Sequence, residues 1–108
     1  MASGTITKTI STSGTNYCKM PDGTLICWGR ASANNVSGTT EVFVAQTFGV
    51  AFYGVPAVVP ALRGASYNRR IHARDITLTG FNAACAFTSS SSTGDIWFDW
   101  VALGRWKA

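Results

Sequence analysis

The sequence is poor in charge. Asp, Glu, Lys and Arg make up 13% of its 108 residues, about half the share of an average soluble domain. It has one glutamate, Glu41, and three lysines, which leaves little to cover the exposed faces of helices. Thr, Ser, Val, Ile, Gly and aromatic residues are abundant instead, and these are typical of strands and turns. The composition therefore argues against a helical bundle, a coiled coil or a disordered chain, and it favours a single all-β domain.

Cysteine and histidine are scarce as well. The three cysteines form no CxxC motif and His72 is the only histidine, so a zinc site with four ligands is not expected. Cys18 and Cys27 flank a predicted hairpin, where they either form a disulfide or serve as small buried hydrophobic residues in a reducing cytosol. We expect no metal and no other cofactor.

The sequence also lacks a dense basic stripe. The formal net charge is +4, and three of the six arginines cluster at Arg69, Arg70 and Arg74. A nucleic-acid-binding domain usually carries more basic residues, interleaved with aromatic ones, so no nucleic acid is expected as a partner. An acidic sugar, teichoic acid or lipopolysaccharide phosphate fits this cluster at least as well.

One segment, residues 42–62, contains no charged residue and has the length of a membrane span. Two glycines and two prolines interrupt it, at Gly49, Gly54, Pro56 and Pro60. Two buried strands joined by a turn explain this pattern better than a helix, and no membrane insertion is expected.

The rest of the chain reads as short strands separated by turns. A hairpin around Pro21-Asp22-Gly23 is the clearest signal, because Pro presets a turn and Gly takes the positive-φ position after it. Residues 30–40 are predicted to be a polar loop, and residues 76–81 to continue the strand pattern after a bulge near Asp75. We expect strands over residues 17–20, 24–29, 41–48, 54–62, 70–74, 82–88 and 95–103. Six or seven strands with turn signals about every ten residues predict an antiparallel β-sandwich.

Two strands offer polar and aromatic side chains for binding. Alternation places Ile71 and Ala73 inward, and Arg70, His72 and Arg74 outward, with Tyr67 and Asn68 in the preceding turn. The last strand turns Trp97 and Asp99 outward, while Trp28 and Trp100 are assigned to the core. Aromatic rings stack on sugars and planar polar groups bind their hydroxyls, so these outward residues suit a glycan. Alternatively, the arginine strand is a solvated or subunit-facing surface, and Trp97 belongs to the core or to a subunit interface. The candidate ligand-binding residues are Tyr67, Asn68, Arg70, His72, Arg74, Trp97 and Asp99.

Catalysis is not expected. Glycoside hydrolysis needs two carboxylates about 5–10 Å apart. Asp95 and Asp99 share one face of a strand at a separation of about 13 Å, which is too far for a retaining pair. Cys85 and His72 have the side chains of a nucleophile pair, but no activating context surrounds them in the sequence. No catalytic residue is therefore assigned, and the protein is predicted not to be an enzyme.

Read in order, four motifs resemble the C-terminal domain of phage and prophage tail fibres. The first is a hairpin ending in Trp-Gly, the second a pair of strands with Phe and Pro-x-Val, the third Thr-Gly-Phe, and the fourth a closing Trp-x-Ala-x-Gly. These motifs are Asn16–Gly29, then Phe43 with Phe48 or Phe52 and Pro56 with Val58, then Thr79-Gly80-Phe81, and finally Trp100-Val101-Ala102-Leu103-Gly104. The resemblance covers residues 16–105, nearly the whole chain.

The second half is also similar to the H-type lectins, which are six-stranded sandwiches that bind N-acetylgalactosamine-like sugars as trimers. The matching run extends from Arg70 to Phe81. It departs from that family at residues 87–93, where the sugar-contacting tryptophan of the lectins has no counterpart, and only Arg70 matches their sugar site. The resemblance thus supports the fold and a receptor-binding role more than specificity for galactosamine.

Together, the resemblances imply a sandwich domain over residues 16–108, preceded at 1–15 by an extended lead-in, either cloning residues or the junction to a fibre shaft. The expected function is that of the non-catalytic, receptor-binding tip of a tail fibre in the virion, recognising a bacterial surface polysaccharide or other glycan. We expect a homotrimer, because three linked copies convert weak sugar contacts into useful avidity. The alternatives are a free-standing H-type-like lectin for galactose-type sugars and a structural trimerisation or capping module of a fibre.

Overall fold

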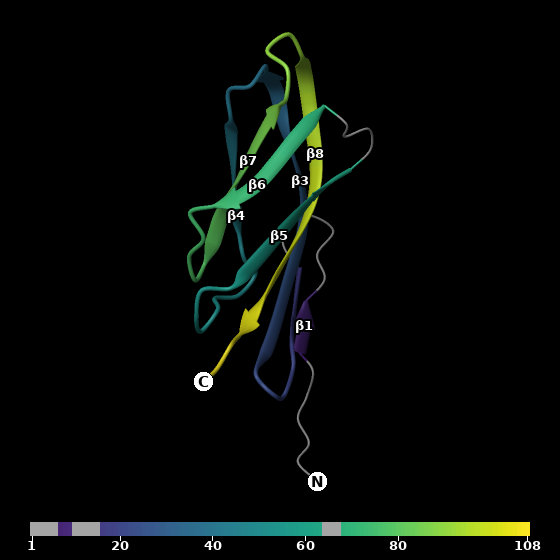
Figure 1. Ribbon diagram of the computed structural model, residues 1–108. Helices are drawn as coiled ribbons and strands as arrows, with labels where there is room; N and C mark the ends of the chain where they lie inside the picture. Colours follow the sequence, from purple (N-terminus) through teal and green to yellow (C-terminus); the bar gives the residue numbers. More distant parts are fainter. Residues whose placement is uncertain (1–6, 10–15, 64–67) are drawn as a thin grey trace.

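The computed structural model describes residues 7–9, 16–63 and 68–108, and all the regular structure in them is β-strand (Figure 1). Among these residues there is no helix long and apolar enough to cross a membrane. The strands are β1 (Thr7–Thr9), β2 (Asn16–Lys19), β3 (Thr24–Ser37), β4 (Val42–Thr47), β5 (Ala57–Leu62), β6 (Arg69–Arg74), β7 (Gly80–Phe87) and β8 (Thr93–Arg105).

Two antiparallel sheets form the molecule. Sheet A has the order β1-β2-β3-β8-β5, and sheet B has the order β4-β7-β6. The long strands β3 and β8 pair along almost their whole length and form the spine that Figure 1 shows running through the molecule. The predicted all-β class and antiparallel sandwich are confirmed, and β2 to β8 are the seven strands expected from residue 16 onward.

The prediction of a polar loop over residues 30–40 was wrong, because β3 continues to Ser37. Ala31 and Ala33 lie opposite Phe98 and Ile96 of β8, and this pairing continues the strand through the polar residues around them. The pairing shifts register between Ala33 and Val36, and Asn35 there has a φ of 57°. The long strand is therefore set by its partner rather than by its own composition.

The prediction of a strand after a bulge at Asp75 was also wrong. Asp75 has a φ of 54°, a left-handed conformation that stops β6 instead of kinking it. The Thr77 side chain then accepts hydrogen bonds from the backbone N–H groups of Thr79 and Gly80, which fold the chain back into β7. A side chain at Gly80 would collide with the Gln46 carbonyl of β4, so glycine is required for this close approach.

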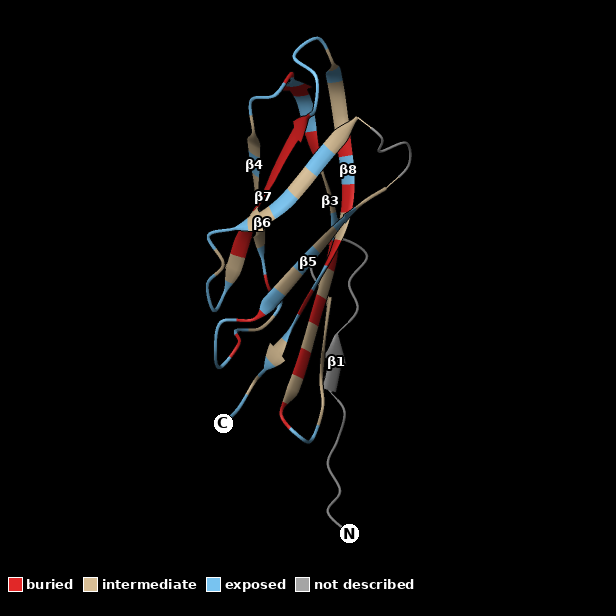
Figure 2. Cartoon of the chain, in the orientation of Figure 1, coloured by how far each residue is buried: buried red, intermediate tan, exposed pale blue. Residues whose placement is uncertain are grey.

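The core lies between the two sheets (Figure 2). At its centre, the Trp100 ring is 5.1 Å from Phe81 and 5.7 Å from Phe48, and its indole N–H donates a hydrogen bond to Gln46 Oε1 at 3.0 Å. Gly29 lies opposite Trp100 and leaves room for the indole, since an added Cβ would be 2.7 Å from it. Trp100 is thus a core residue as predicted, whereas the prediction for Trp28 was wrong: it lies outside the core, on the other face of sheet A.

Cys18 and Cys27 are free thiols. Cys18 lies opposite Ile26 and Cys27 lies opposite Tyr17, so the two side chains are on opposite faces of the hairpin. This geometry rules out the disulfide and selects the alternative in which Cys27 is a buried hydrophobic residue. Burial raises the pKa of the Cys27 thiol to about 11, which keeps it protonated at neutral pH.

Candidate functional site

The outward face of sheet B carries the arginine strand predicted from the sequence. Along β6, the side chains alternate as expected: Ile71 and Ala73 face the core, and Arg70, His72 and Arg74 face solvent. The alternation arises because successive residues of a strand point to opposite sides of the sheet. Three basic or titratable side chains therefore stand in one row.

All three side chains converge on one carboxylate. Arg70 Nη1 donates to Glu41 Oε2 at 3.3 Å, His72 Nδ1 lies 3.5 Å from the same oxygen, and Arg74 Nη1 lies 3.8 Å from Oε1. Arg70 also donates from Nη2 to the carbonyl of Thr39 at 3.1 Å. Glu41 immediately precedes β4, at the opposite edge of sheet B from β6, so these contacts reach across the central strand.

Small residues on β7 make this reach possible. Ala86 lies opposite Arg70, and Ala84 lies between His72 of β6 and Phe43 of β4. Both alanines are almost completely inaccessible, although they face away from the core. They form a flat floor, and the longer side chains of the two flanking strands lie over it.

An aromatic ring and further polar groups complete the face. The Phe43 ring is 50% exposed, and the Arg74 guanidinium lies over it at 4.8 Å from the ring centre. Arg74 Nε is 3.5 Å from Asp75 Oδ2, which also accepts a hydrogen bond from Asn82 Nδ2 at 3.1 Å. We call Glu41, Phe43, Arg70, His72, Arg74, Asp75 and Asn82 the ionic face. With His72 neutral it carries no net charge, so it offers paired donors and acceptors beside an apolar ring rather than a cationic patch.

Sequence reasoning missed Glu41 and Phe43 as members of this site. Both are on the far strand of sheet B, and only the pairing of β4 with β7 brings them to β6. The available signal was that Glu41 is the only glutamate of a charge-poor chain, directly before an alternating strand.

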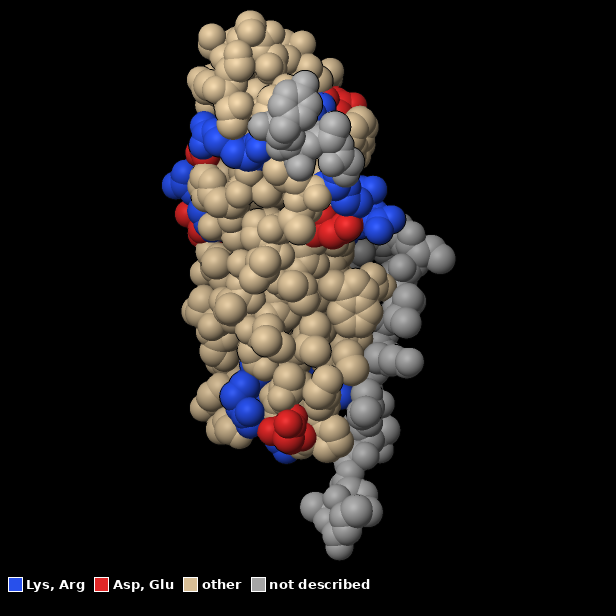
Figure 3. Space-filling model, turned by 45° about the vertical axis from the view of Figure 1, so that its right-hand side comes forward, with Lys and Arg blue, Asp and Glu red and all other residues tan. Residues whose placement is uncertain are grey.

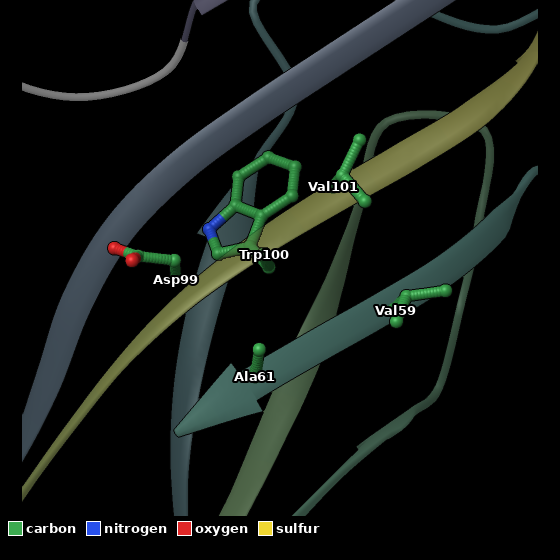
Figure 4. A pocket seen from close by; sticks show the side chains of 5 residues that line it. All are labelled: Val59, Ala61, Asp99, Trp100 and Val101. Atoms are coloured by element: carbon green, nitrogen blue, oxygen red, sulfur yellow. The ribbon is translucent and has the colours of Figure 1, made fainter. Parts of the chain in front are cut away.

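Trp97 and Asp99 lie elsewhere, on the outward face of β8 in sheet A, as the alternation predicted. Asp99 Oδ1 accepts a hydrogen bond from Arg30 Nε at 2.8 Å and lies 3.2 Å from Arg63 Nε, an ion pair without hydrogen-bond geometry. Beside it, a shallow hollow of about 210 Å³ is lined by Val59, Ala61, Asp99, Trp100 and Val101 (Figure 4). The candidate residues therefore divide between the outer faces of two different sheets and do not form one site.

The two turn residues add little to either group. Asn68 accepts hydrogen bonds at its carbonyl from the backbone N–H and the hydroxyl of Thr88, and its side chain accepts one from Arg69, so it ties the start of β6 to the end of β7. Tyr67 lies outside the described residues.

The Cys85–His72 pair considered as a nucleophile is not formed. Cys85 faces the core opposite Ile71, whereas His72 is on the outer face of the same sheet. Burial raises the pKa of the Cys85 thiol to about 11, the reverse of what a nucleophilic cysteine needs. Within the described residues, no three His, Cys, Asp or Glu side chains gather in a way that could hold a metal ion.

Comparisons with known proteins place this geometry in a structural group. No protein-family model and no curated protein matches the chain. Among solved structures, an N-truncated R1-type pyocin tail fibre aligns with a TM-score of 0.76 at 17% identity, over 96% of this chain and 88% of that one. The chain has the fold of a tail fibre domain. The resemblance to tail fibres is thus confirmed at the level of the fold, whereas the likeness to H-type lectins is not confirmed.

Longer pyocin fibres give the same result. A C-terminal piece of the R1 pyocin fibre of P. aeruginosa aligns with a TM-score of 0.76 at 17% identity over 96% of this chain, and a piece of the R2 fibre aligns with 0.69 at 16% over the same share. The chain spans 29% and 27% of those two C-terminal pieces. A domain of this fold is therefore one part of a longer fibre in both.

Proposed function

We propose that this chain is the non-catalytic receptor-binding tip of a phage or prophage tail fibre, located in the virion, and that its ionic face binds a bacterial surface glycan. The observation that carries the proposal is the arrangement of Arg70, His72 and Arg74 around Glu41, beside the exposed ring of Phe43. The fold shared with pyocin tail fibres supports the fibre role.

The chemistry of the face suits a polyol. A carboxylate accepts hydrogen bonds from two neighbouring hydroxyls, and a guanidinium donates a planar pair of them. Phe43 offers an apolar ring against which the C–H face of a sugar stacks. Because the charges of the face balance, a neutral sugar loses little binding free energy on approach. An acidic sugar gains binding free energy only where it displaces Glu41 from Arg70 or Arg74.

Avidity is part of the same proposal. One shallow, exposed face of this kind binds a single sugar with a Kd on the order of millimolar, about −4 kcal/mol. Three copies in a homotrimer, each facing the same cell surface, raise the apparent affinity by about 10²–10⁴ without any new contact.

Separate alanine substitutions of Arg70 and Trp97 test the proposal, because they lie on different sheets. Arg70→Ala is expected to weaken attachment to host cells, and binding on a bacterial glycan array, by about tenfold or more. Arg105→Ala is the matched control, since it removes an exposed arginine at the opposite end of the molecule. If Trp97→Ala weakens binding and Arg70→Ala does not, the glycan site is on sheet A; if neither does, both site assignments are wrong.

One observation favours a second candidate, the structural trimerisation or capping module. The cations of the ionic face are matched within their own chain by Glu41 and Asp75, so the face is satisfied without a ligand. This alternative predicts an oligomer that binds no glycan on the array and shows no change on substitution of Arg70.

A further inference from the structure

The outer face of sheet A carries a second group of polar and aromatic side chains, separate from the ionic face. The register of β3 with β8 places Arg30 opposite Asp99. The next outward pair on these two strands is Ser32 with Trp97. The backbone N–H of Arg63 donates to the carbonyl of Trp97 at 2.9 Å, so Arg63 extends β5 alongside Trp97. We call Arg30, Ser32, Arg63, Trp97 and Asp99 the Trp97 site.

In the Trp97 site, one carboxylate holds two guanidiniums. Asp99 Oδ1 accepts a hydrogen bond from Arg30 Nε at 2.8 Å, and Arg63 Nε lies 3.2 Å from the same oxygen. A guanidinium has five N–H donors in a planar fork, and in both arginines the contacting atom is Nε. Within the part of the chain that the structure describes, the Nη groups of these arginines donate no hydrogen bond, so most of their donors remain for a ligand.

The Trp97 site has an excess of positive charge. Its two arginines face one carboxylate, whereas the cations of the ionic face are balanced by Glu41 and Asp75. The next carboxylate along β8, Asp95, accepts a hydrogen bond from the backbone N–H of Asn35 at 3.0 Å and forms no ion pair with another described residue. An anion that approaches the two arginines is therefore attracted by a net positive charge.

An apolar stretch begins where this charge ends. Val101 and Leu103 follow Asp99 on the outward side of β8 and are 39% and 52% exposed. In the view of Figure 3, charged side chains gather at two levels of the molecule, with a broad zone between them that has none. Beside Asp99, the hollow of about 210 Å³ also has Val59 and Ala61 in its lining (Figure 4). A ligand held by the two arginines therefore meets apolar surface directly beside its charged group.

Trp97 adds an exposed aromatic ring to the arginines. Its side chain is 46% exposed, although tryptophan is highly buried on average. Cβ atoms of directly opposite residues in an antiparallel pair are about 4.5–5.5 Å apart, so the indole and the Arg63 side chain start from neighbouring positions. The C–H face of a sugar ring stacks on an indole, and a guanidinium binds a carboxylate through two parallel hydrogen bonds. One sugar residue can therefore use both groups.

We propose that the Trp97 site binds an acidic sugar, whose ring stacks on Trp97 and whose carboxylate lies between Arg30 and Arg63. Asp99 is a positioning residue, because it holds the two like charges side by side. A bare phosphate would use the arginines but not the indole, and a neutral sugar would use the indole but not the arginines. The combination therefore favours a sugar ring that carries a carboxylate.

This inference goes beyond the proposed function, since it assigns a second site to the other sheet and a different ligand to that site. The ionic face suits a neutral polyol because its charges balance, whereas the Trp97 site gains binding free energy from a negative charge on the ligand. If both proposals hold, the two outer faces bind different sugars of a surface polysaccharide. The Trp97 site does not depend on the ionic face, so each is tested without the other.

Titration of the isotope-labelled chain at neutral pH, followed by nuclear magnetic resonance, tests the proposal. The probes are tri-galacturonate and its methyl ester, which have the same rings with and without the carboxylate charges. We expect tri-galacturonate to bind about tenfold more tightly, because only the charged form receives charge-assisted hydrogen bonds from the arginines. The indole N–H signal of Trp97 should shift with both probes, and added NaCl should reduce the difference between their affinities.

Substitutions separate the contribution of charge from that of stacking. Arg63→Gln should reduce the preference for the acid over the ester to about twofold or less. Trp97→Ala should weaken the binding of both probes by about two- to tenfold, because stacking does not depend on the charge. Arg105→Gln is the matched control, since it removes an exposed arginine at the far end of the molecule and should keep the preference. Arg30→Gln serves as a second variant should Arg63→Gln fail to fold, as judged by circular dichroism.

A preference for the acid that is lost in Arg63→Gln and kept in Arg105→Gln supports the proposal. Equal binding of the acid and the ester by the wild type overturns it, and so does a preference that survives both Arg63→Gln and Arg30→Gln. Inorganic phosphate that binds as tightly as tri-galacturonate would show that the arginines take an anion without a sugar, which also overturns the proposal.

The same titration separates this inference from the proposed function. Shifts confined to the signals of the ionic face overturn the Trp97 site and leave the proposed function standing. Shifts of the Trp97 indole that persist in the Arg70→Ala variant support the Trp97 site, whatever the glycan array shows for that variant.

Discussion

The two outer faces of this sandwich are built on the same pleated backbone, but they use the central strand in opposite ways. On sheet B, β7 places Ala84 and Ala86 outward, and long polar side chains from the flanking strands lie over them. On sheet A, β8 places Val101 and Leu103 outward, where they are 39% and 52% exposed. The first face satisfies its own charges and stays open to water, whereas the second leaves hydrophobic side chains exposed. The size of the central-strand residues decides which kind of surface forms.

The largest effect is expected from removing what the two faces share. Phe98 is completely buried between the sheets, so Phe98→Ala should lower the free energy of unfolding by about 3–5 kcal/mol and weaken assembly and glycan binding together. Denaturant unfolding measures the change. Val55→Ala should stay within about 0.5 kcal/mol of the wild type, because Val55 is exposed. An equally small effect of Phe98→Ala would mean that the sheets do not pack as described.

A second substitution makes the ionic face resemble the apolar one. Ala84→Leu places a large side chain beneath His72 and Phe43, and we expect it to lower the free energy of unfolding by about 1–3 kcal/mol. It should also weaken glycan binding strongly, because the leucine would stand between Phe43 and His72 in the middle of the ionic face. Ala51→Leu, at an exposed position between β4 and β5, is the control. Glycan binding that survives Ala84→Leu would show that the floor has no part in recognition.

A third change alters the charge of the ionic face without altering its shape. Glu41→Gln leaves Arg70 and Arg74 with only Asp75 to balance them, so the face becomes positive. Because these ion pairs are exposed, stability should change by less than about 1 kcal/mol. Binding to an anionic polysaccharide should rise and become more sensitive to salt, while binding to a neutral glycan should fall. Asp99→Asn removes one negative charge from sheet A and should leave binding of the neutral glycan as it was.

The smallest effect is expected at a position that belongs to neither face. The backbone N–H of Thr24 donates to Asp22 at 2.9 Å, and this hydrogen bond, with Arg105 nearby, lowers the pKa of the carboxyl below its usual 3.8. A lowered folded-state pKa contributes stability above pH 3.8 and loses it as the pH falls through the folded value. Asp22→Asn should therefore reduce stability slightly at neutral pH and flatten its acid dependence below pH 4. Both faces should keep their functions. A change in oligomeric state would show that Asp22 contributes to one of them.

Local patterns predicted much of the fold. The hairpin at Pro21-Asp22-Gly23, the strands β4 to β6 and the outward direction of Arg70, His72 and Arg74 all follow from turn chemistry and the two-residue period of strands. The second half of β3 could not be predicted in this way. Its Asn and Ser residues are typical of loops, and the strand forms because β8 pairs with it over residues 30–37.

The candidate site shows the same limit. The sequence predicted which side chains of one strand face outward, but it does not reveal which strand lies on the far side of the neighbouring strand in the same sheet. Glu41 and Arg70 are 29 residues apart in the chain and meet only because β4 and β6 pair with the same central strand. For the same reason, chemistry alone places Trp97 and Arg70 in one candidate site, although they belong to different sheets.

The alanine floor also bears on how such a domain diverges. Because Ala84 and Ala86 support the ionic face without belonging to the core, the side chains above them at positions 41, 43, 70, 72 and 74 are free to change without repacking the interior. Under the proposed function, substitutions at a few positions on β4 and β6 would adapt the domain to an altered surface sugar, with the sandwich preserved. A library randomised at positions 43, 70, 72 and 74 would be a compact starting point for redirecting the domain to a new host.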